Sequence, residues 1–269
     1  MAGRLHGKTA IVLGAAGRDN MGQAIARRFT EEGAKVAVAG RHKDELDRFA
    51  REIGGRGLLC DITDRAQVFA LTRDVKKAFG RVDIGLNATG WGLLEPFEQT
   101  TEESLSKMID LQFKGPYYFF QALIEAMKSN APASSSILTI SSATAKIMLN
   151  DHASYMGCKA GIDHIIRIIG NEFGEYGIRA NSISPGLTET PMTADAIAAP
   201  GLTEAFLPGY PLGRIGTKDD VAAAAVWLSS DECFMTGENL QVNGGLTLRR
   251  NPTREEIVAS VTQAAAGRS

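Results

Sequence analysis

The sequence predicts a doubly wound α/β fold, and three observations support this prediction. Short apolar segments alternate along the chain with longer segments of helical spacing. The first apolar segment, Thr9–Leu13, runs directly into a glycine-rich turn and then into a helical pattern. The chain has 269 residues, of which 44% are hydrophobic and 22% charged, enough for one large domain with a substantial core. We therefore expect a single α/β domain over residues 1–269.

The first half of the chain supplies four of the expected strands. Each is short, apolar and bounded by glycine or polar residues, and they fall at Thr9–Leu13, Lys35–Ala39, Gly57–Cys60 and Ile84–Ala88. A helix over Met21–Glu32 carries Ile25 and Phe29 on one face, and a polar helix begins near Lys43. Asp64 is a suitable N-cap for a helix that ends at Phe79.

The second half supplies three more strands and two long helices. The helices are expected at about 101–129 and 153–175, and the strands at Ser136–Ile140, Arg179–Ile183 and Leu240–Val242. Strands joined through helices favour right-handed crossovers, which give a parallel sheet covered on both faces. The expected architecture is thus a seven-stranded parallel sheet of the Rossmann type.

Two segments interrupt this alternation. The connection over Pro185–Tyr210 is long and rich in Pro, Gly, Thr and Ala, and connections of that length are usually functional. We expect residues 187–215 to form a substrate lid. Residues 249–269 form a C-terminal extension, which we expect to be a surface helix.

Composition and charge argue against several classes of protein. The net charge is −2 with no basic block, so we expect no nucleic-acid partner. No apolar run reaches 18 residues and residues 1–8 do not resemble a secretory signal, so we expect no membrane span. Cys60, Cys158 and Cys233 are scattered, which fits reduced thiols in the cytoplasm. The four histidines lack ligand spacing, and we expect no metal.

The glycine-rich turn over residues 14–22 is the first candidate binding element. Its backbone N–H groups can approach a pyrophosphate, and the positive end of the following helix favours an anion there. We take Gly14, Arg18, Met21 and Gly22 as candidate cofactor contacts. The spacing is not Gly-x-Gly-x-x-Gly, and the alternative is a flexible loop without a ligand.

The ends of the second and third strands give further candidates. Dinucleotide-binding folds that take NAD usually have an acidic residue after the second strand, whereas this chain has Gly40 and then Arg41. A guanidinium pairs with a 2′-phosphate, so Arg41 favours NADP(H), with Arg18 and Lys43 as possible helpers. Arg41 could instead be a solvated surface residue. Asp61 and Ile62 follow the third strand, and Asp61 either accepts from adenine or caps a turn.

Motifs spread over residues 7–247 resemble the short-chain dehydrogenase/reductase family. They are the glycine turn, Asp61, Asn87-Ala88-Thr89-Gly90, Ser142, Tyr155-x-x-x-Lys159, Asn181, Pro185-Gly186 and Asn243-Gly244-Gly245. The resemblance implies that Ser142, Tyr155 and Lys159 are catalytic. It also implies that Asn87, Gly90, Tyr155, Lys159, Thr188 and Thr190 contact the cofactor. The spacing of 13 residues from Ser142 to Tyr155 chooses Ser142 over Ser141.

The chain departs from the family pattern at three places. The glycine turn is two residues longer than usual, a length that resembles the enoyl-reductase branch. The usual Asn-Asn-Ala-Gly reads Asn87-Ala88-Thr89-Gly90. The helix asparagine that holds a relay water in the family aligns with Gln112, so the path of protons behind Lys159 is expected to be rearranged.

The three candidate residues can together reduce a carbonyl. A reduced nicotinamide supplies hydride, and a positioned acid must supply the proton. Lys159 lies one helical turn after Tyr155, so its ammonium is expected to lower the pKa of the phenol. The alternative is that Tyr155 is a packed aromatic residue and Lys159 a solvated charge.

The residues expected near the substrate are mostly apolar. They are Trp91, Leu93, Leu94, Ile147, Met148, Leu149, Met192, Phe206 and Leu207, and they could equally pack the lid. We expect interconversion of an apolar ketone and its secondary alcohol. One alternative is an enoyl-thioester reductase, although six residues usually separate its tyrosine and lysine and here only three do. The other is an inactive cofactor-sensing protein. The two long helices resemble the family's dimer face, which implies a homotetramer.

Overall fold

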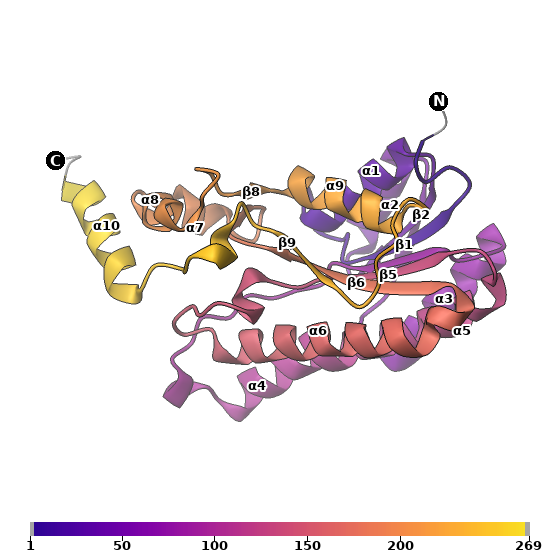
Figure 1. Ribbon diagram of the computed structural model, residues 1–269, viewed down its shortest axis with the longest axis horizontal. Helices are drawn as coiled ribbons and strands as arrows, with labels where there is room; N and C mark the ends of the chain where they lie inside the picture. Colours follow the sequence, from indigo (N-terminus) through magenta and orange to yellow (C-terminus); the bar gives the residue numbers. More distant parts are fainter. Residues whose placement is uncertain (1–2, 267–269) are drawn as a thin grey trace.

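A computed structural model describes residues 3–266 and confirms the doubly wound parallel sheet (Figure 1). The strands lie in the order β3-β2-β1-β4-β5-β6-β9, and each pairs in parallel with its neighbours. Their bounds are β1 Thr9–Leu13, β2 Lys35–Gly40, β3 Arg56–Leu59, β4 Ile84–Asn87, β5 Ser135–Ile140, β6 Ile178–Pro185 and β9 Asn239–Val242. The order reverses at β1, because β2 and β4 lie on its two sides.

The strand sequences suit a sheet that is buried on both faces. All five residues of β1 are buried, and alternate residues point to opposite sides. Ala10 and Val12 join one hydrophobic cluster, whereas Ile11 and Leu13 join the other. Two separate cores therefore form, one on each face of the sheet.

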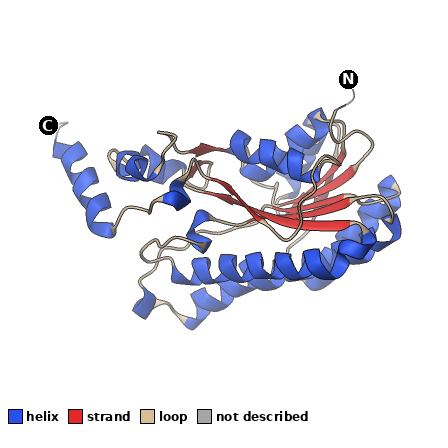
Figure 2. Cartoon of the chain, in the orientation of Figure 1, coloured by secondary structure: helices blue, strands red, loops and turns tan. Residues whose placement is uncertain are grey.

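Helices cover both faces (Figure 2). One face packs against α1 (Met21–Glu31), α2 (Lys43–Glu52) and α9 (Lys218–Ser229). The other packs against α3 (Arg65–Phe79), α5 (Gly115–Met127) and α6 (Ala153–Phe173). Helix α9 is not among the helices expected above, although a capping box formed by Thr217 and Asp220 begins it.

The long helix expected over 101–129 is divided in the structure. Helix α4 (Glu102–Ile109) and helix α5 are joined by a π-helical segment, Asp110–Lys114. Pro116 has no N–H and cannot donate to the carbonyl four residues earlier. The Gly115 N–H donates instead to Asp110, five residues back. The widened turn contains Gln112, so the irregular helix coincides with a position that the sequence marks as unusual.

The segment between β6 and α9 carries small elements of its own. Strand β7 (Thr188–Glu189) pairs with β8 (Gly216–Thr217), and α7 (Ala194–Ala198) and α8 (Leu202–Phe206) lie between them. A third cluster includes Phe206, Tyr210 and Leu246. Helix α10 (Arg254–Ala266) packs against α8, away from the sheet (Figure 1). Residues 267–269 of the expected extension lie outside the described residues.

Candidate active site

The candidate residues gather at the carboxyl edge of the sheet, beside the reversal in strand order. Gly14 follows β1 and Asn87 ends β4, and these two strands are neighbours. Ser142 follows β5, the next strand in the sheet. Open parallel sheets bind their ligands at this edge, outside the point where the strand order reverses.

The glycine turn is shaped for a close backbone approach. Gly14 has a φ of +106°, and a Cβ built on it would lie 2.5 Å from the carbonyl carbon of Ala88. A Cβ on Gly22 would lie 2.6 Å from the Gly14 oxygen. Only glycine fits at these positions, because any side chain would separate α1 from β1 or the turn from the loop after β4. The turn therefore fits the diphosphate of a dinucleotide, with Met21 as the first residue of α1.

Asn20 accounts for the additional length of the turn. Its Nδ2 donates to the Gly14 carbonyl at 2.8 Å, and its Oδ1 accepts from the Gln23 N–H at 2.9 Å. Asn20 is therefore the N-cap of α1, and it also ties the end of the turn to its start. Asp19 occupies a left-handed conformation, and its carbonyl accepts from Lys218 Nζ at 3.0 Å. Neither Asn20 nor Lys218 was among the candidate residues.

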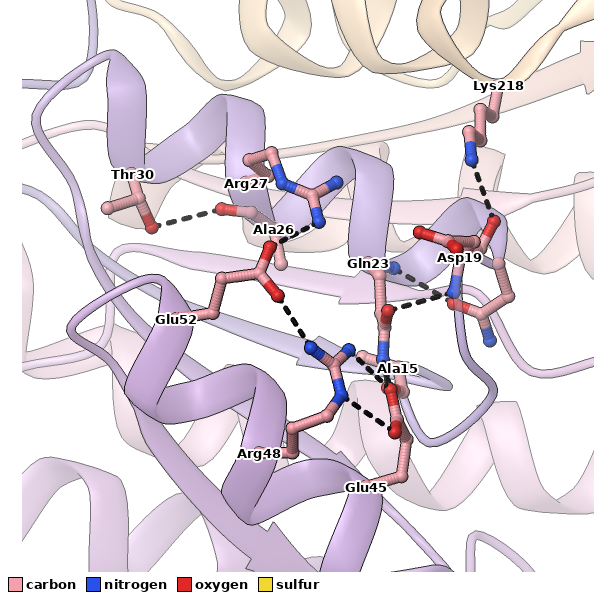
Figure 3. Close-up of polar contacts among 11 residues, drawn as sticks. Ala15, Asp19, Gln23, Ala26, Arg27, Thr30, Glu45, Arg48, Glu52 and Lys218 are labelled. Carbon is pink, nitrogen blue, oxygen red and sulfur yellow. Dashed lines mark hydrogen bonds and ion pairs between the residues drawn. The ribbon is translucent and has the colours of Figure 1, made fainter.

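A polar network joins the turn to α2 (Figure 3). Buried Gln23 donates to the Ala15 carbonyl at 3.1 Å and to Glu45 at 2.8 Å. Arg48 pairs with Glu45 and Glu52, and Arg27 pairs with Glu52. The hydrogen bond with Arg48 lowers the pKa of Glu45 to about 2. The start of α2 is thereby held against the turn.

Two of the three cations proposed for a 2′-phosphate are unpaired. Arg41 follows β2 and Arg18 lies on the glycine turn, and both side chains are exposed. Neither forms an ion pair within residues 3–266. Lys43 instead pairs with Asp47, one turn along α2. Arg18 and Arg41 are therefore available to an anion, and Lys43 is not.

The remaining cofactor candidates line the same edge. Asp61 Oδ1 accepts from the N–H and hydroxyl of Thr63, at 2.9 and 2.8 Å, so this carboxylate caps a turn. The Ile62 side chain is buried in the core, which leaves only its backbone for a ligand. Asn87 is buried and accepts from the Thr89 N–H at 3.1 Å. Gly90 lies beside Gln112, whose Nε2 is 3.6 Å from a Cβ built on Gly90.

Thr188 and Thr190 are held by a residue outside the candidate set. The Thr193 hydroxyl donates to the Thr188 carbonyl at 2.5 Å and accepts from the Thr190 N–H at 3.1 Å. The Thr188 hydroxyl donates to Gly186 at 2.9 Å. This turn places both threonines after β6, which lies three strands from β1 in the sheet.

The structure brings Ser142, Tyr155 and Lys159 together. Tyr155 lies in the first turn of α6, and Lys159 lies one turn later with its Nζ 5.3 Å from the centroid of the Tyr155 ring. Lys159 Nζ donates to the Ile140 carbonyl at the end of β5 at 2.7 Å. A hydrogen bond from Ser142 acts to lower the pKa of Tyr155, whereas one from the buried Ser141 hydroxyl acts to lower the pKa of Asp163. The geometry thus favours Ser142 over Ser141.

The pKa of Tyr155 moves opposite to the expectation from Lys159. Burial raises it to about 12, and the hydrogen bond with Ser142 opposes that rise. Burial also lowers the pKa of Lys159 to about 8. Desolvation therefore outweighs the attraction of the ammonium for a tyrosinate, and the phenol keeps its proton at neutral pH.

His152 is a site residue that the sequence reasoning missed. Its ring stacks on Tyr155 with centroids 4.3 Å apart, and its Nδ1 lies 2.7 Å from the Leu93 carbonyl oxygen. A carbonyl only accepts, so Nδ1 carries the proton. Burial lowers the pKa of His152, so the ring is neutral at pH 7. Its position three residues before Tyr155, on one helical face, was the available signal.

Gln112 has a definite role in the geometry of the site. Its side chain is buried, and Nε2 donates to the Trp91 carbonyl at 3.1 Å. Its Oε1 is buried without a partner among residues 3–266. The Gln112 amide therefore fixes the loop after β4.

The apolar candidates separate into three groups by burial. Ile147, Leu149 and Phe206 pack within the third hydrophobic cluster, which is the structural alternative stated above. Leu94, Met148 and Met192 are exposed, at 66%, 70% and 66%. Trp91, Leu93 and Leu207 are half-buried, and Lys107 lies over the Trp91 ring. The exposed group is available to a substrate.

Within residues 3–266, no three His, Cys, Asp or Glu side chains form a group that could hold a metal ion. No helix in that range combines the length and apolarity needed to cross a bilayer. The three cysteines are free and buried.

Comparison with known proteins gives a consistent set of matches. A family model described as enoyl-(acyl carrier protein) reductase matches residues 14–247. The NADP-dependent (R)-specific alcohol dehydrogenase of Lentilactobacillus kefiri is 32% identical over 92% of this chain and 99% of its own. The NAD-dependent glycerol dehydrogenase of Listeria innocua is 33% identical over 90% and 94%. A short-chain type dehydrogenase/reductase of Mycobacterium ulcerans superposes with a TM-score of 0.89, at 27% identity over 97% and 98%.

Proposed function

The chain belongs to the short-chain dehydrogenase/reductase family of alcohol and carbonyl oxidoreductases, and we propose that it is an NADP(H)-dependent enzyme interconverting an apolar ketone and its secondary alcohol. The observation that carries this proposal is the convergence of Ser142, Tyr155 and Lys159 beside the glycine turn. When bound, the nicotinamide cofactor supplies or accepts the hydride.

Tyr155 is the proposed general acid for ketone reduction. Its pKa of about 12 keeps the Oη proton in place until negative charge develops on the substrate oxygen. Ser142, which hydrogen-bonds Tyr155, orients that oxygen toward the phenol. In alcohol oxidation the same Oη receives the proton.

Lys159 is the proposed electrostatic partner. Its ammonium lies over the Tyr155 ring, and the Ile140 carbonyl holds it there. A cation next to a phenol stabilises the tyrosinate that remains after proton transfer. Lys159, with Asn87, Gly90, Thr188 and Thr190, is also proposed to contact the nicotinamide half of the cofactor.

Substitution of Tyr155 tests the chemistry. We expect Tyr155→Phe to reduce kcat for ketone reduction by about 10²- to 10⁴-fold, the usual contribution of a positioned acid. Tyr176→Phe, in the 3-10 turn that follows α6, is the matched control and should be neutral. Full activity of Tyr155→Phe would refute the assignment.

The preference for NADP(H) is proposed from Arg18 and Arg41, which are exposed and unpaired among the described residues. We expect Arg41→Ala to raise KM for NADPH about tenfold or more while KM for NADH changes little, because only NADPH has the 2′-phosphate. Arg56→Ala, an exposed arginine at the amino end of β3, is the control. Equal effects on both cofactors would contradict the proposal.

The apolar substrate is proposed from Leu94, Met148 and Met192, which stay exposed at the site. Residues 187–215 are the proposed lid over it. A panel of bulky ketones, small keto acids, dihydroxyacetone and glycerol, followed by NADPH absorbance, tests this. The highest kcat/KM should belong to the bulky ketones. Preference for glycerol, which the Listeria innocua relative is named for, or for keto acids would refute it.

Enoyl-thioester reduction is the second candidate. The description of the matching family and the long glycine turn favour it. The Tyr155–Lys159 spacing favours carbonyl reduction, because enoyl reductases usually have six intervening residues. Activity on a crotonyl thioester, with none on ketones, would select this candidate. A protein that binds NADPH and turns over neither class would instead be a cofactor sensor.

We further propose a cytoplasmic homotetramer. Leu105, Tyr117 and Ile168 on α4, α5 and α6 are exposed apolar side chains on the helices expected to form a dimer face. The free, buried cysteines fit a reducing compartment. Size-exclusion chromatography with light scattering should give four times the monomer mass of 28.7 kDa, and a monomer would refute the assembly.

A further inference from the structure

A buried polar cluster lies behind Lys159 and is not used by the mechanism above. Asp163 lies on α6, one helical turn after Lys159, so both side chains share a face of that helix. Asn239, the first residue of β9, donates its Nδ2 to Asp163 Oδ2 at 2.8 Å. The Ser182 and Ser141 hydroxyls also act on this carboxyl and lower its pKa, and its second oxygen, Oδ1, is buried.

Hydrogen bonds connect this cluster to Ser142, which follows the end of β5. Asn239 Nδ2 also lies 2.8 Å from Ser182 Oγ and 2.9 Å from Ser184 Oγ, and both serines are fully buried. The Ser184 hydroxyl donates to the backbone carbonyl of Ser142 at 3.1 Å. Polar contacts therefore run from Asp163 through β9 and β6 to the candidate catalytic serine.

A buried ammonium needs compensation that the strands cannot supply. Lys159 is 4% exposed, and its single hydrogen bond goes to the neutral carbonyl of Ile140. The ionisable groups beside it on α6 are Tyr155, Cys158 and Asp163. The other elements packed against α6 carry Lys107, Lys146 and the ion pair of Asp110 with Lys114. The charges that act on the pKa of Lys159 are nevertheless those of Asp163 and Cys158. Asp163 is thus the carboxylate placed to compensate the ammonium.

We propose that Asp163 is a positioning residue of the reaction, held by Asn239, which keeps the Lys159 ammonium charged beside Tyr155. The effect of Asp163 on the charge of Lys159 does not depend on the proposed function, whereas its effect on catalysis does. The charge of Asp163 raises the pKa of Lys159 against the larger lowering by burial. Burial raises the pKa of Asp163 itself, and hydrogen bonds with Ser182, Ser141 and Asn239, followed by the charge of Lys159, oppose that rise.

The first test measures Lys159 directly and needs no turnover. Protein with ¹³C-labelled lysine is titrated by NMR, with Lys159→Arg used to assign the resonance. We expect Asp163→Asn to lower the Lys159 midpoint by about one pH unit or more, the usual effect of one nearby charge. Glu172→Gln, an exposed acid on the same helix, should leave the midpoint unchanged. An unchanged midpoint in Asp163→Asn would overturn the proposal.

The second test is the pH profile of ketone reduction. In Asp163→Asn, the fall of kcat/KM at alkaline pH should begin about one pH unit lower than in the wild type. At high pH this shift corresponds to about a tenfold loss of kcat/KM. At pH 6 the activity should stay near that of the wild type. A uniform loss at all pH values would mean a structural role and overturn the proposal. If Asp163→Asn does not fold, Asp163→Ser, which places an uncharged hydroxyl in the cluster, is used instead. Failure of both variants to fold would also overturn the proposal. Wild-type protein inactive on every ketone would refute the proposed function and leave the NMR test standing.

Discussion

At the scale of single residues, desolvation affects the pKa values of the two proposed catalytic groups more strongly than their mutual attraction does. Tyr155 and Lys159 lie close together, which favours the ion pair of tyrosinate and ammonium. Burial favours the neutral form of each, raising the pKa of Tyr155 to about 12 and lowering that of Lys159 to about 8. The site is therefore set for proton donation by Tyr155 and depends on a cation that is easily lost.

The pH dependence of reduction follows from these two pKa values. Reduction needs Tyr155 protonated and Lys159 charged, so both groups must hold their protons. Lys159, with the lower pKa, loses its proton first as pH rises. We expect kcat/KM for ketone reduction to be level below about pH 8 and to fall above it. A limb that begins only near pH 12, the pKa of Tyr155, would show that the Lys159 charge is not required.

His152 offers a second prediction, because its two contacts can be separated. His152→Phe keeps a ring on Tyr155 but loses the bond to Leu93, whereas His152→Asn keeps a donor but loses the stack. Loss of one hydrogen bond costs about 1 kcal/mol, roughly fivefold. We expect His152→Phe to raise KM for the ketone by about that factor with little change in kcat, since Leu93 is on the substrate side.

The His152→Asn variant is compared with His152→Phe to separate the two contacts. His152→Asn should lower kcat more than it raises KM, because the ring that fixes Tyr155 is gone. Steady-state kinetics on both variants with one ketone measures the difference. Identical kinetic defects in the two variants would show that the contacts are not separable.

At the scale of elements, the irregular segment between α4 and α5 links the helix layer to the substrate side of the site. The π-helical turn carries Gln112, whose amide holds the Trp91 carbonyl at 3.1 Å. Trp91 follows β4, in the loop that also carries Leu93 and Leu94. The helix distortion caused by Pro116 therefore positions a loop that an unbroken helix would not reach in this way.

Replacing Gln112 tests this link. Gln112→Met keeps the length of the side chain but cannot donate to Trp91, so a half-buried carbonyl loses its partner. We expect KM for the ketone to rise about fivefold and the free energy of unfolding to fall by about 1 kcal/mol, the usual value of one hydrogen bond. Kinetics and urea unfolding measure the two effects. Gln121→Met, exposed on α5, is the control, and a matching effect there would contradict the prediction.

The elements and contacts that the sequence predicted are those set by local spacing. The strand β1 and the Tyr155–Lys159 pair follow from residues within a few positions of one another. Contacts between residues far apart in the sequence could not be predicted from local spacing. Examples are Lys218 with Asp19, 199 positions apart, and Asn239 with Asp163, 76 positions apart. Helix α9 was missed although its capping box is local, because its run of alanines gives a weak apolar face.

At the scale of the whole molecule, the C-terminal helix connects two parts of the substrate side. Ser260 on α10 donates to the Gly201 carbonyl at 2.7 Å, next to α8 in the proposed lid. Arg254, at the start of α10, pairs with Asp151, which precedes His152. Just before the helix, Asn251 donates to the Met148 carbonyl at 3.0 Å. The segment thus joins residues 187–215 to the loop after β5.

Removal of residues 254–269 should therefore affect the substrate and spare the cofactor. The truncation deletes the Ser260 and Arg254 contacts, and two hydrogen bonds at about 1 kcal/mol each correspond to a rise of roughly tenfold or more in KM for the ketone. The dissociation constant for NADPH should stay within twofold, because Gly14, Arg18 and Arg41 lie on other elements. Ser260→Ala should reproduce part of the rise, and Thr262→Ala, exposed on the same helix, none. Equal losses for ketone and NADPH would mean that α10 stabilises the whole domain, and unchanged kinetics would mean that its contacts do not hold the lid.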